Sequence, residues 1–198
     1  MELLDWKNKL PDFELTKGEI SSLLLQKGIR TFHEACVFVS ELPYRRTKNR
    51  DDLSAVLTEN GGTCSSKHGL LGQICFENGY ENIELIAGVF LMSGETHPSI
   101  YSILDSNNLT ILPEMHCYLR FKGERFDFTS PHANFEKIAS KIVREQWIEP
   151  HQVGDWKVKI HKSYLESWLE RNPQINHSLE QLWEIREKCI EEFSSSGF

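Results

Sequence analysis

The sequence predicts an α+β domain in which helices on both sides enclose a β-rich middle third. Helix start and stop signals dominate the first third, and the patterns typical of strands gather between residues 83 and 129. Because these strands are not separated by regularly spaced helices, the order favours α+β over a βαβ repeat. A chain of 198 residues is long enough for one domain with appendages.

Two capping boxes predict the first helices. The segments 16–19 and 31–34 both read Thr-x-x-Glu, in which a hydroxyl and a carboxylate can bond the free N–H groups at a helix start. The first helix should end at Gly28, and the second at about Leu42 because Pro43 follows.

Two further helices precede the predicted strands. Asp51 or Asp52 can cap a short helix through Leu57. A strong helix signal then runs from Cys64 to Asn78 and stops at Gly79.

Three strands are predicted in the middle third. Residues 83–92 are apolar on both faces, which fits a central strand. Residues 115–121 and 125–129 surround Lys122-Gly123, which we take as the two turn residues of a hairpin.

The last third is expected to be mainly helical. The predicted elements are a helix over 131–146, a strand over 156–161, and helices over 162–171 and 179–193. Ser178 and Gln181 form a capping box for the last helix.

Composition and charge argue against several classes of protein. The 29 acidic residues outnumber 22 basic ones, and a net charge of −7 does not suit a nucleic-acid or anionic-membrane binder. No apolar run approaches the roughly 20 residues that span a bilayer, and the first residues lack signal-peptide features, so a cytoplasmic protein without a membrane partner is expected. Five cysteines without a CxxC pair predict reduced thiols rather than disulfides. We expect neither a metal nor a cofactor.

The segment 44–50 is a local exception to the acidic character. It reads Tyr-Arg-Arg-Thr-Lys-Asn-Arg and is followed by Asp51-Asp52, which favours a solvated loop. The alternatives are a cationic rim beside a functional site and, less favoured, a contact with nucleic acid.

One cysteine has a setting that favours reactivity. Cys64 follows Gly61 and Gly62 at the start of a predicted helix, where unpaired N–H groups and the helix dipole stabilise a thiolate. His68 lies one turn further on the same stripe and is expected to pack below it. The other thiols are assigned to the core, and they are Cys36, Cys75, Cys117 and Cys189.

His116 and Asp127 can supply the base and the orienting acid that a catalytic thiol needs. With Lys122-Gly123 as the turn, Tyr118 faces Asp127, and His116 lies on the same face at a diagonal distance of about 7 Å. The opposite face of this hairpin is apolar. Ordinary in-and-out patterning of a solvent-facing sheet is the alternative explanation.

Several segments together resemble the transglutaminase-like superfamily, which has a papain-like Cys-His-Asp core. The matching segments are Leu42-Pro43-Tyr44, Ala55-Val56-Leu57, Gly62-Thr63-Cys64 with its helix to Gly79-Tyr80, 115–121 and 126–129. In that superfamily a cysteine at a helix N-terminus packs against an antiparallel sheet that carries the histidine and the aspartate. The resemblance implies one domain with a core over about 42–130, a helical flank over 1–41 and a mainly helical extension over 131–198.

The resemblance also implies roles for individual residues. Cys64 would be the nucleophile, His116 the general base and acid, and Asp127 the orienting acid. The Cys64 backbone N–H would contribute to an oxyanion hole. The candidates for a second oxyanion donor or a supporting group are Tyr44, Asn60 and Tyr118.

The expected function is cysteine-dependent acyl transfer, or amide or peptide hydrolysis, through a thioester formed from a peptide, amide or small acyl substrate. Water and an amine both remain open as the acceptor. One alternative is a catalytically silent binding module. Another is an arylamine N-acetyltransferase-like acyltransferase, whose Arg-Gly-Gly-x-Cys segment is only partly matched by residues 61–64. A metal site at Cys64 and His68 is disfavoured because His116 and Cys117 point to opposite faces of one strand.

Overall fold

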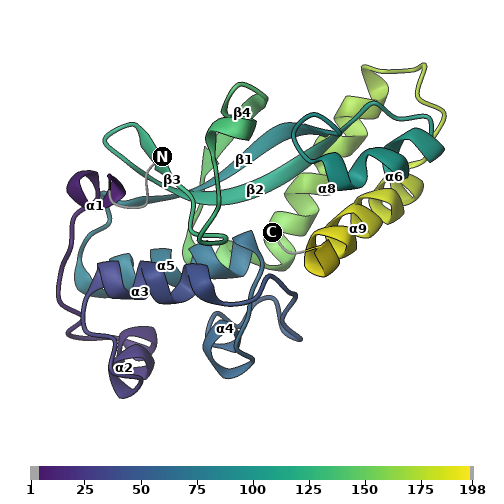
Figure 1. The fold of residues 1–198 in the computed structure, drawn as a ribbon. Helices are drawn as coiled ribbons and strands as arrows, with labels where there is room; N and C mark the ends of the chain where they lie inside the picture. Colours follow the sequence, from purple (N-terminus) through teal and green to yellow (C-terminus); the bar gives the residue numbers. More distant parts are fainter. Residues whose placement is uncertain (1–4, 197–198) are drawn as a thin grey trace.

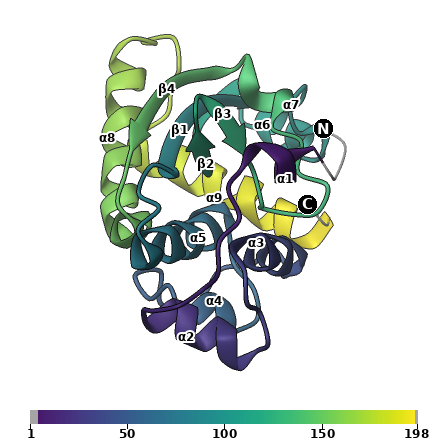
Figure 2. The same ribbon diagram turned by 90° about the vertical axis from the view of Figure 1, so that its left-hand side faces the viewer.

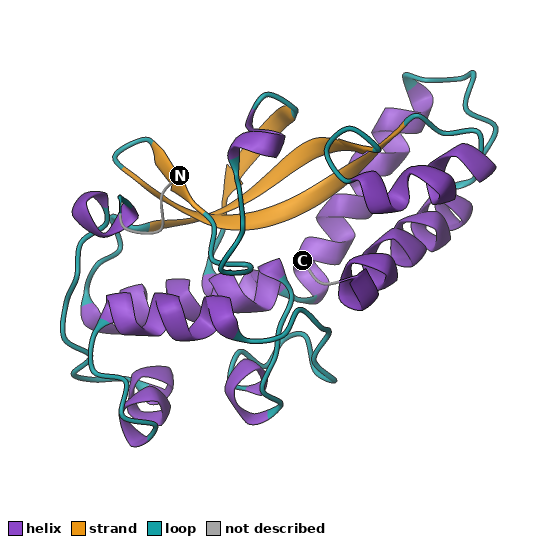
Figure 3. Ribbon diagram, in the orientation of Figure 1, coloured by secondary structure: helices purple, strands orange, loops and turns teal. Residues whose placement is uncertain are grey.

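The computed structural model describes residues 5–196 and has an α+β fold, as the sequence predicts. Within these residues nine α-helices flank one antiparallel sheet of four strands (Figures 1 and 3). The strands are β1 (Glu84–Ser93), β2 (Ile111–Phe121), β3 (Glu124–Phe126) and β4 (Ile142–Trp147). The helices are α1 (Trp6–Lys9), α2 (Glu19–Gln26), α3 (Phe32–Glu41), α4 (Ala55–Thr58), α5 (Cys64–Asn78), α6 (Tyr101–Ser106), α7 (Glu136–Ala139), α8 (Asp155–Glu170) and α9 (Leu179–Ser196), with short 3-10 helices η1 (Pro98–Ile100) and η2 (Pro150–Val153).

The sheet has the order β3-β2-β1-β4, so β1 and β2 form its centre. They pair along ten residues of β1, from Glu84 opposite Arg120 to Ser93 opposite Ile111. This confirms the prediction of a central strand in this region. Its apolar residues on both faces are needed because both faces of the sheet are covered.

The two faces of the sheet bury two different hydrophobic clusters. Leu85 and Cys117, on one face, pack in a cluster with side chains of α3 and α5. Phe90 and Leu112, on the other face, pack with side chains of α6, α8 and α9. Both views place α3 and α5 on the same side of the sheet, with α2 and α4 beyond them (Figures 1 and 2).

The hairpin of β2 and β3 has the predicted register. Leu119 lies opposite Phe126, and Phe121 lies opposite Glu124. The turn residues Lys122 and Gly123 have φ angles of 50° and 83°, which is the positive-φ pair of a type I′ turn. β3 ends at Phe126, however, so the strand is shorter than the predicted 125–129 and leaves part of β2 unpaired on that side.

The C-terminal third differs from the prediction in two elements. The helix predicted over 131–146 is wrong, because α7 covers only four residues and β4 then joins the sheet. β4 pairs with β1, with Trp147 opposite Ile86, and these ladder hydrogen bonds override the local helix signal. The strand predicted over 156–161 is also wrong, since these residues belong to α8.

The capping box predicted at 16–19 is wrong as well, whereas the box at Thr31 is present. The hydroxyl of Thr16 donates to Oδ1 of Asn78, 3.1 Å away, rather than to α2. Glu77 of α5 caps α2 instead, by accepting the N–H groups of Ile20 and Ser21 at 3.0 and 2.8 Å. A tertiary contact therefore replaces the local cap.

Candidate active site

Cys64 is the first residue of α5, and the loop before it is held on both sides. The N–H of Gly62 donates to the carbonyl of Pro43 at 3.1 Å, and the N–H of Thr63 donates to Oγ of Ser66 at 3.0 Å. A Cβ atom on residue 62 would lie 2.7 Å from that Ser66 oxygen, so a larger residue would displace the hydroxyl that holds Thr63. The loop thus presents the thiol at the tip of a rigid helix.

His116 and Asp127 lie side by side. The Nε2 atom of His116 is 2.8 Å from Oδ2 of Asp127, and the two side chains are only 9% and 7% exposed. The other carboxylate oxygen accepts the N–H of Thr129 at 2.9 Å, which fixes Asp127 although it lies just beyond β3. Because an ionised carboxylate only accepts, His116 donates from Nε2 and keeps Nδ1 for another partner.

The sulfur of Cys64 meets β2 where that strand has a free edge. β3 pairs only with the last residues of β2, from Leu119 onward, and no other strand of residues 5–196 lies on this side. Side chains, rather than another strand, bond the backbone along this buried edge. The Nζ of Lys157 donates to the carbonyl of Met115 at 2.6 Å, and the N–H of Cys117 bonds the sulfur of Cys64. The short β3 therefore gives the thiol access to the sheet.

Charges around Cys64 favour the thiolate. Burial raises the pKa of its thiol, but the charge of His116, a hydrogen bond from His116 and the charge of Lys157 outweigh burial and lower the pKa to about 6. Burial lowers the pKa of His116, whereas the negative charges of Asp127 and Cys64 hold it well above its ordinary value. Burial raises the pKa of Asp127, but His116 keeps it well below its usual range. Near neutral pH the site therefore holds a thiolate–imidazolium pair oriented by a carboxylate.

Cys64, His116 and Asp127 line one cavity of about 360 Å³. This volume lies within the range of small-molecule sites, about 300–1,000 Å³. Apolar side chains that line it include Phe90, Ile138 and Phe193. Polar side chains that line it include Asn134 and Lys137, from the segment before α7 and from α7 itself.

The three candidate oxyanion or supporting residues occupy different places. Tyr44 lines the cavity together with Cys64. Asn60 is exposed, has a φ of 56° and is not among the residues that line the cavity. Tyr118 is buried with its ring 6.1 Å from the ring of His116, and its hydroxyl donates to Glu145 of β4. Tyr44 is thus beside the thiol, and Tyr118 supports His116 from the sheet.

Two side chains of α5 hold the site together, and sequence reasoning recognised only one of them. His68 lies below Cys64, as expected. Lys67 was missed, although it is fully buried and its Nζ donates to the carbonyls of Leu42 at 2.5 Å and Thr129 at 2.6 Å. Lys67 therefore ties α5 to the segment just before Tyr44 and to the segment just after Asp127. A lysine within an otherwise buried helix was the available signal.

Lys157 was also missed. Its Nζ donates to Oγ of Ser65 at 2.8 Å as well as to β2, and its charge contributes to the low pKa of Cys64. It was missed because residues 156–161 were predicted as a strand, whereas they lie in α8, which packs Lys157 against Ser65 and β2.

The other cysteines are buried, which confirms their assignment to the core. Cys36, Cys75 and Cys117 belong to the first hydrophobic cluster, and Cys189 belongs to the second. Burial raises the pKa of each of these thiols. Cys64 is the cysteine whose pKa is lowered.

Across residues 5–196 no helix is long and apolar enough to cross a membrane. In the same part of the chain, no three His, Cys, Asp or Glu side chains converge as ligands for a metal ion. Comparisons with protein-family models, curated proteins and solved structures find no match for this chain. A proposal about function therefore rests on the geometry of the site.

Proposed function

We propose that this protein is a cysteine-dependent enzyme that transfers or hydrolyses an acyl group through a thioester on Cys64. The observation that carries the proposal is the convergence of a low-pKa thiol, a histidine and a buried aspartate on one cavity. It agrees with the transglutaminase-like resemblance of residues 42–130, which we propose as the family relationship. The catalytic roles are Cys64 as nucleophile, His116 as acid and base, and Asp127 as the orienting group.

In the first half-reaction the Cys64 thiolate attacks the acyl carbonyl carbon and forms a C–S bond. The negative charge that develops on the carbonyl oxygen is stabilised by the Cys64 N–H at the start of α5. His116 then gives its Nδ1 proton to the leaving nitrogen as the C–N bond breaks. Asp127 keeps the imidazolium in place because its carboxylate accepts the Nε2 proton.

In the second half-reaction water or an amine attacks the thioester. His116 takes a proton from the attacking group, and the C–S bond breaks to regenerate the thiolate. The substrate is a peptide, an amide or a small acyl compound, and the cavity has room for such a group.

Alkylation by iodoacetamide at pH 7, followed by peptide mapping, tests the proposal. Cys64 should react faster than a cysteine in a short peptide. Cys36, Cys75 and Cys189 in the same molecule should be nearly inert, because burial raises the pKa of each of these thiols and they stay protonated. The variant His116→Gln should slow the alkylation of Cys64. A rate for Cys64 no higher than that of the peptide thiol would contradict the activated nucleophile.

An acyl donor distinguishes an enzyme from a catalytically silent module. Mixing the protein with p-nitrophenyl acetate should release a burst of nitrophenolate and leave an acetyl group on Cys64, detected by intact mass after an acid quench. Cys64→Ser should abolish this burst. An alkylation-competent thiol that never forms the thioester would favour the binding module.

A further inference from the structure

A second cavity, of about 60 Å³, also reaches Cys64. The start of α5, from Thr63 to Ser66, lines it together with side chains of α8 and α9. Cys64 and Tyr44 border both cavities, whereas His116 and Asp127 border only the larger one. The thiol therefore stands between two compartments.

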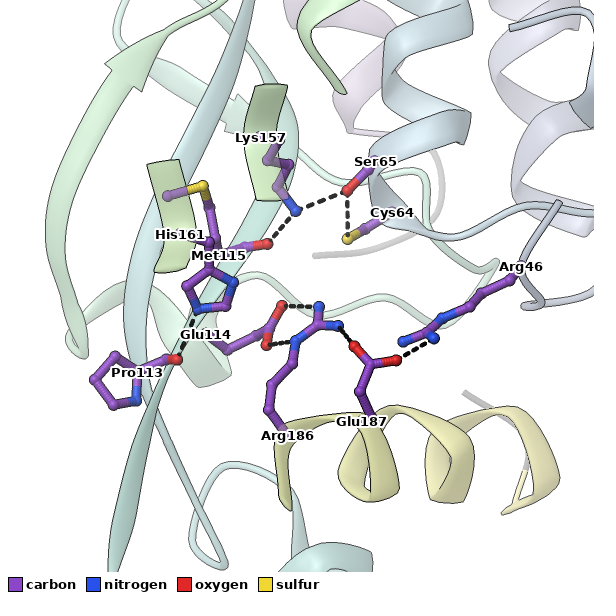
Figure 4. Close-up of polar contacts among 10 residues, drawn as sticks. All are labelled: Arg46, Cys64, Ser65, Pro113, Glu114, Met115, Lys157, His161, Arg186 and Glu187. Atoms are coloured by element: carbon purple, nitrogen blue, oxygen red, sulfur yellow. Dashed lines mark hydrogen bonds and ion pairs between the residues drawn. The ribbon is translucent and has the colours of Figure 1, made fainter. Parts of the chain in front are cut away.

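The smaller cavity is strongly basic. Its lining contains four cationic side chains and no acidic one, and the cations are Arg46, Arg50, Lys157 and Arg186. Glu114 and Glu187, which are not part of the lining, pair with two of these cations (Figure 4). Within the described part of the chain, Arg50 and Lys157 have no carboxylate partner. The cavity thus keeps an excess of positive charge.

Lys157 and the start of α5 bring positive charge close to the thiol. Lys157 donates to Oγ of Ser65, and that oxygen lies 3.8 Å from the sulfur of Cys64 (Figure 4). The first turn of α5, a helix of 15 residues, contributes the positive end of its dipole at the same place. A space of about 60 Å³ exceeds the roughly 15 Å³ that one water needs and suits a group of a few heavy atoms.

We propose that the smaller cavity is an anion subsite that binds a carboxylate carried by the acyl part of the substrate, an inference that rests on the proposed function. The leaving nitrogen must receive a proton from His116, and His116 lines only the larger cavity. The leaving group therefore occupies the larger cavity, and the smaller one is left for the acyl part. The substrate class is an amide whose acyl chain bears a carboxylate a few bonds from the reacting carbonyl.

Only some of the cations in the basic segment 44–50 line the small cavity. Arg46 and Arg50 line the small cavity, whereas Arg45 and Lys48 do not. Arg50 is exposed and is not among the groups that set the pKa of Cys64, so Arg50→Gln should remove anion binding without disabling the thiol. Arg45→Gln is its matched control, with the same change of charge in the same segment.

Two alkylating agents that differ in charge test the subsite. The rate of Cys64 alkylation is measured with iodoacetate and with iodoacetamide, and the ratio of the two rates is compared among the wild type, Arg50→Gln and Arg45→Gln. We expect the ratio to fall at least about threefold in Arg50→Gln, which corresponds to a modest charge interaction, and to keep the wild-type value in Arg45→Gln. Equal ratios in all three proteins would overturn the subsite.

A competition between two acyl donors tests the position of the carboxylate. The protein is mixed with equal amounts of the phenyl thioesters of butyrate and of succinate monoanion. In each, the Cys64 thiolate forms a new C–S bond as thiophenolate leaves. Intact mass should show mainly succinyl-Cys64 in the wild type and Arg45→Gln, and less of it in Arg50→Gln. A dominant butyryl adduct in all three would overturn the inference.

The outcomes separate the two proposals. If no acyl adduct forms, the proposed function fails, while the alkylation ratio still decides whether the cavity binds an anion. If adducts form without charge preference, the proposed function stands and the subsite is wrong.

Discussion

The ring of His68 accepts a hydrogen bond from the backbone N–H of Phe128 at 2.8 Å, across the interface between α5 and the segment that follows β3. Its other nitrogen, Nδ1, donates to the carbonyl of Cys64 at 2.8 Å. This fixes the neutral tautomer, because Nε2 must stay unprotonated to accept. One buried imidazole thus couples the nucleophile to the residue beside Asp127.

Replacing His68 by leucine should destabilise the protein, because the Phe128 N–H loses its acceptor and the Cys64 carbonyl loses its side-chain donor. We expect the free energy of unfolding at pH 7 to fall by about 2 kcal/mol or more.

Burial is the main reason that the pKa of His68 is lowered to about 4. In the unfolded chain the pKa of His68 is about 6.5, so the unfolded state binds a proton before the folded state does as the pH falls.

His68 therefore contributes stability above pH 6.5 that is lost as the pH falls toward 4. Urea denaturation at pH 7.5 and pH 5 measures this loss, which should be smaller in His68→Leu than in the wild type. His151→Leu, at an exposed position, is the matched control for the change of side chain. An unchanged pH dependence in His68→Leu would show that His68 is not the titrating group.

The rate of Cys64 alkylation should depend on pH in a characteristic way. The thiolate is the reactive form, so the rate should rise as the pH passes about 6 and then level off, whereas an ordinary thiol titrates near 8.5. In His116→Ala the midpoint should move upward, because burial would then act without the opposing imidazolium charge. Stopped-flow alkylation from pH 4.5 to pH 9 measures both curves. A wild-type midpoint above pH 8 would refute the ion pair.

The parts of the site that could be predicted from sequence depend on short-range rules. The two turn residues Lys122 and Gly123 set the hairpin register, and that register brings His116 to Asp127. The helix pattern and the stop signal at Gly79 likewise placed α5 from Cys64 to Asn78. These features follow from backbone conformations that few residues adopt.

The parts that could not be predicted depend on contacts between distant segments. The alternation of Trp156, Val158 and Ile160 with polar residues is typical of a strand, yet α8 buries Lys157 and His161 against the free edge of β2. A window of six residues cannot separate these two patterns. β4 was missed for a similar reason, because an edge strand with Arg144 and Glu145 lacks a strong apolar run.

The ion pair of Glu114 and Arg186 should be needed for stability. Both nitrogen–oxygen distances are 2.7 Å, and the side chains are only 6% and 11% exposed. Arg186→Met should lower the free energy of unfolding at pH 7 by about 3–5 kcal/mol, because Glu114 would be left buried and unpaired. Burial raises the pKa of Glu114, but Arg186 outweighs it and lowers the pKa to about 2.

The pair therefore contributes stability above the ordinary glutamate pKa of about 4.3, and this contribution is lost as the pH falls toward 2. The double variant Glu114→Gln/Arg186→Met should be more stable than Arg186→Met alone, since no charge is left unpaired. Urea denaturation of the single and double variants measures the coupling. Additive losses would mean that the two residues act independently.

Tyr44 lines the cavity together with Cys64, so we predict that its hydroxyl is the second oxyanion donor and acts in acyl transfer but not in alkylation. Burial raises the pKa of Tyr44 well above its ordinary value, so the hydroxyl keeps its proton near neutral pH and can donate it. An acyl carbonyl attacked by Cys64 develops a negative oxygen, whereas iodoacetamide alkylation does not. Tyr44→Phe should therefore slow acetylation of Cys64 by p-nitrophenyl acetate about 100-fold, within the range of a lost oxyanion donor, and leave the alkylation rate unchanged. Tyr101→Phe, at an exposed tyrosine, should change neither rate. An equal loss in both reactions would show instead that Tyr44 positions the thiol, and no loss in either would leave the N–H of Cys64 as the donor.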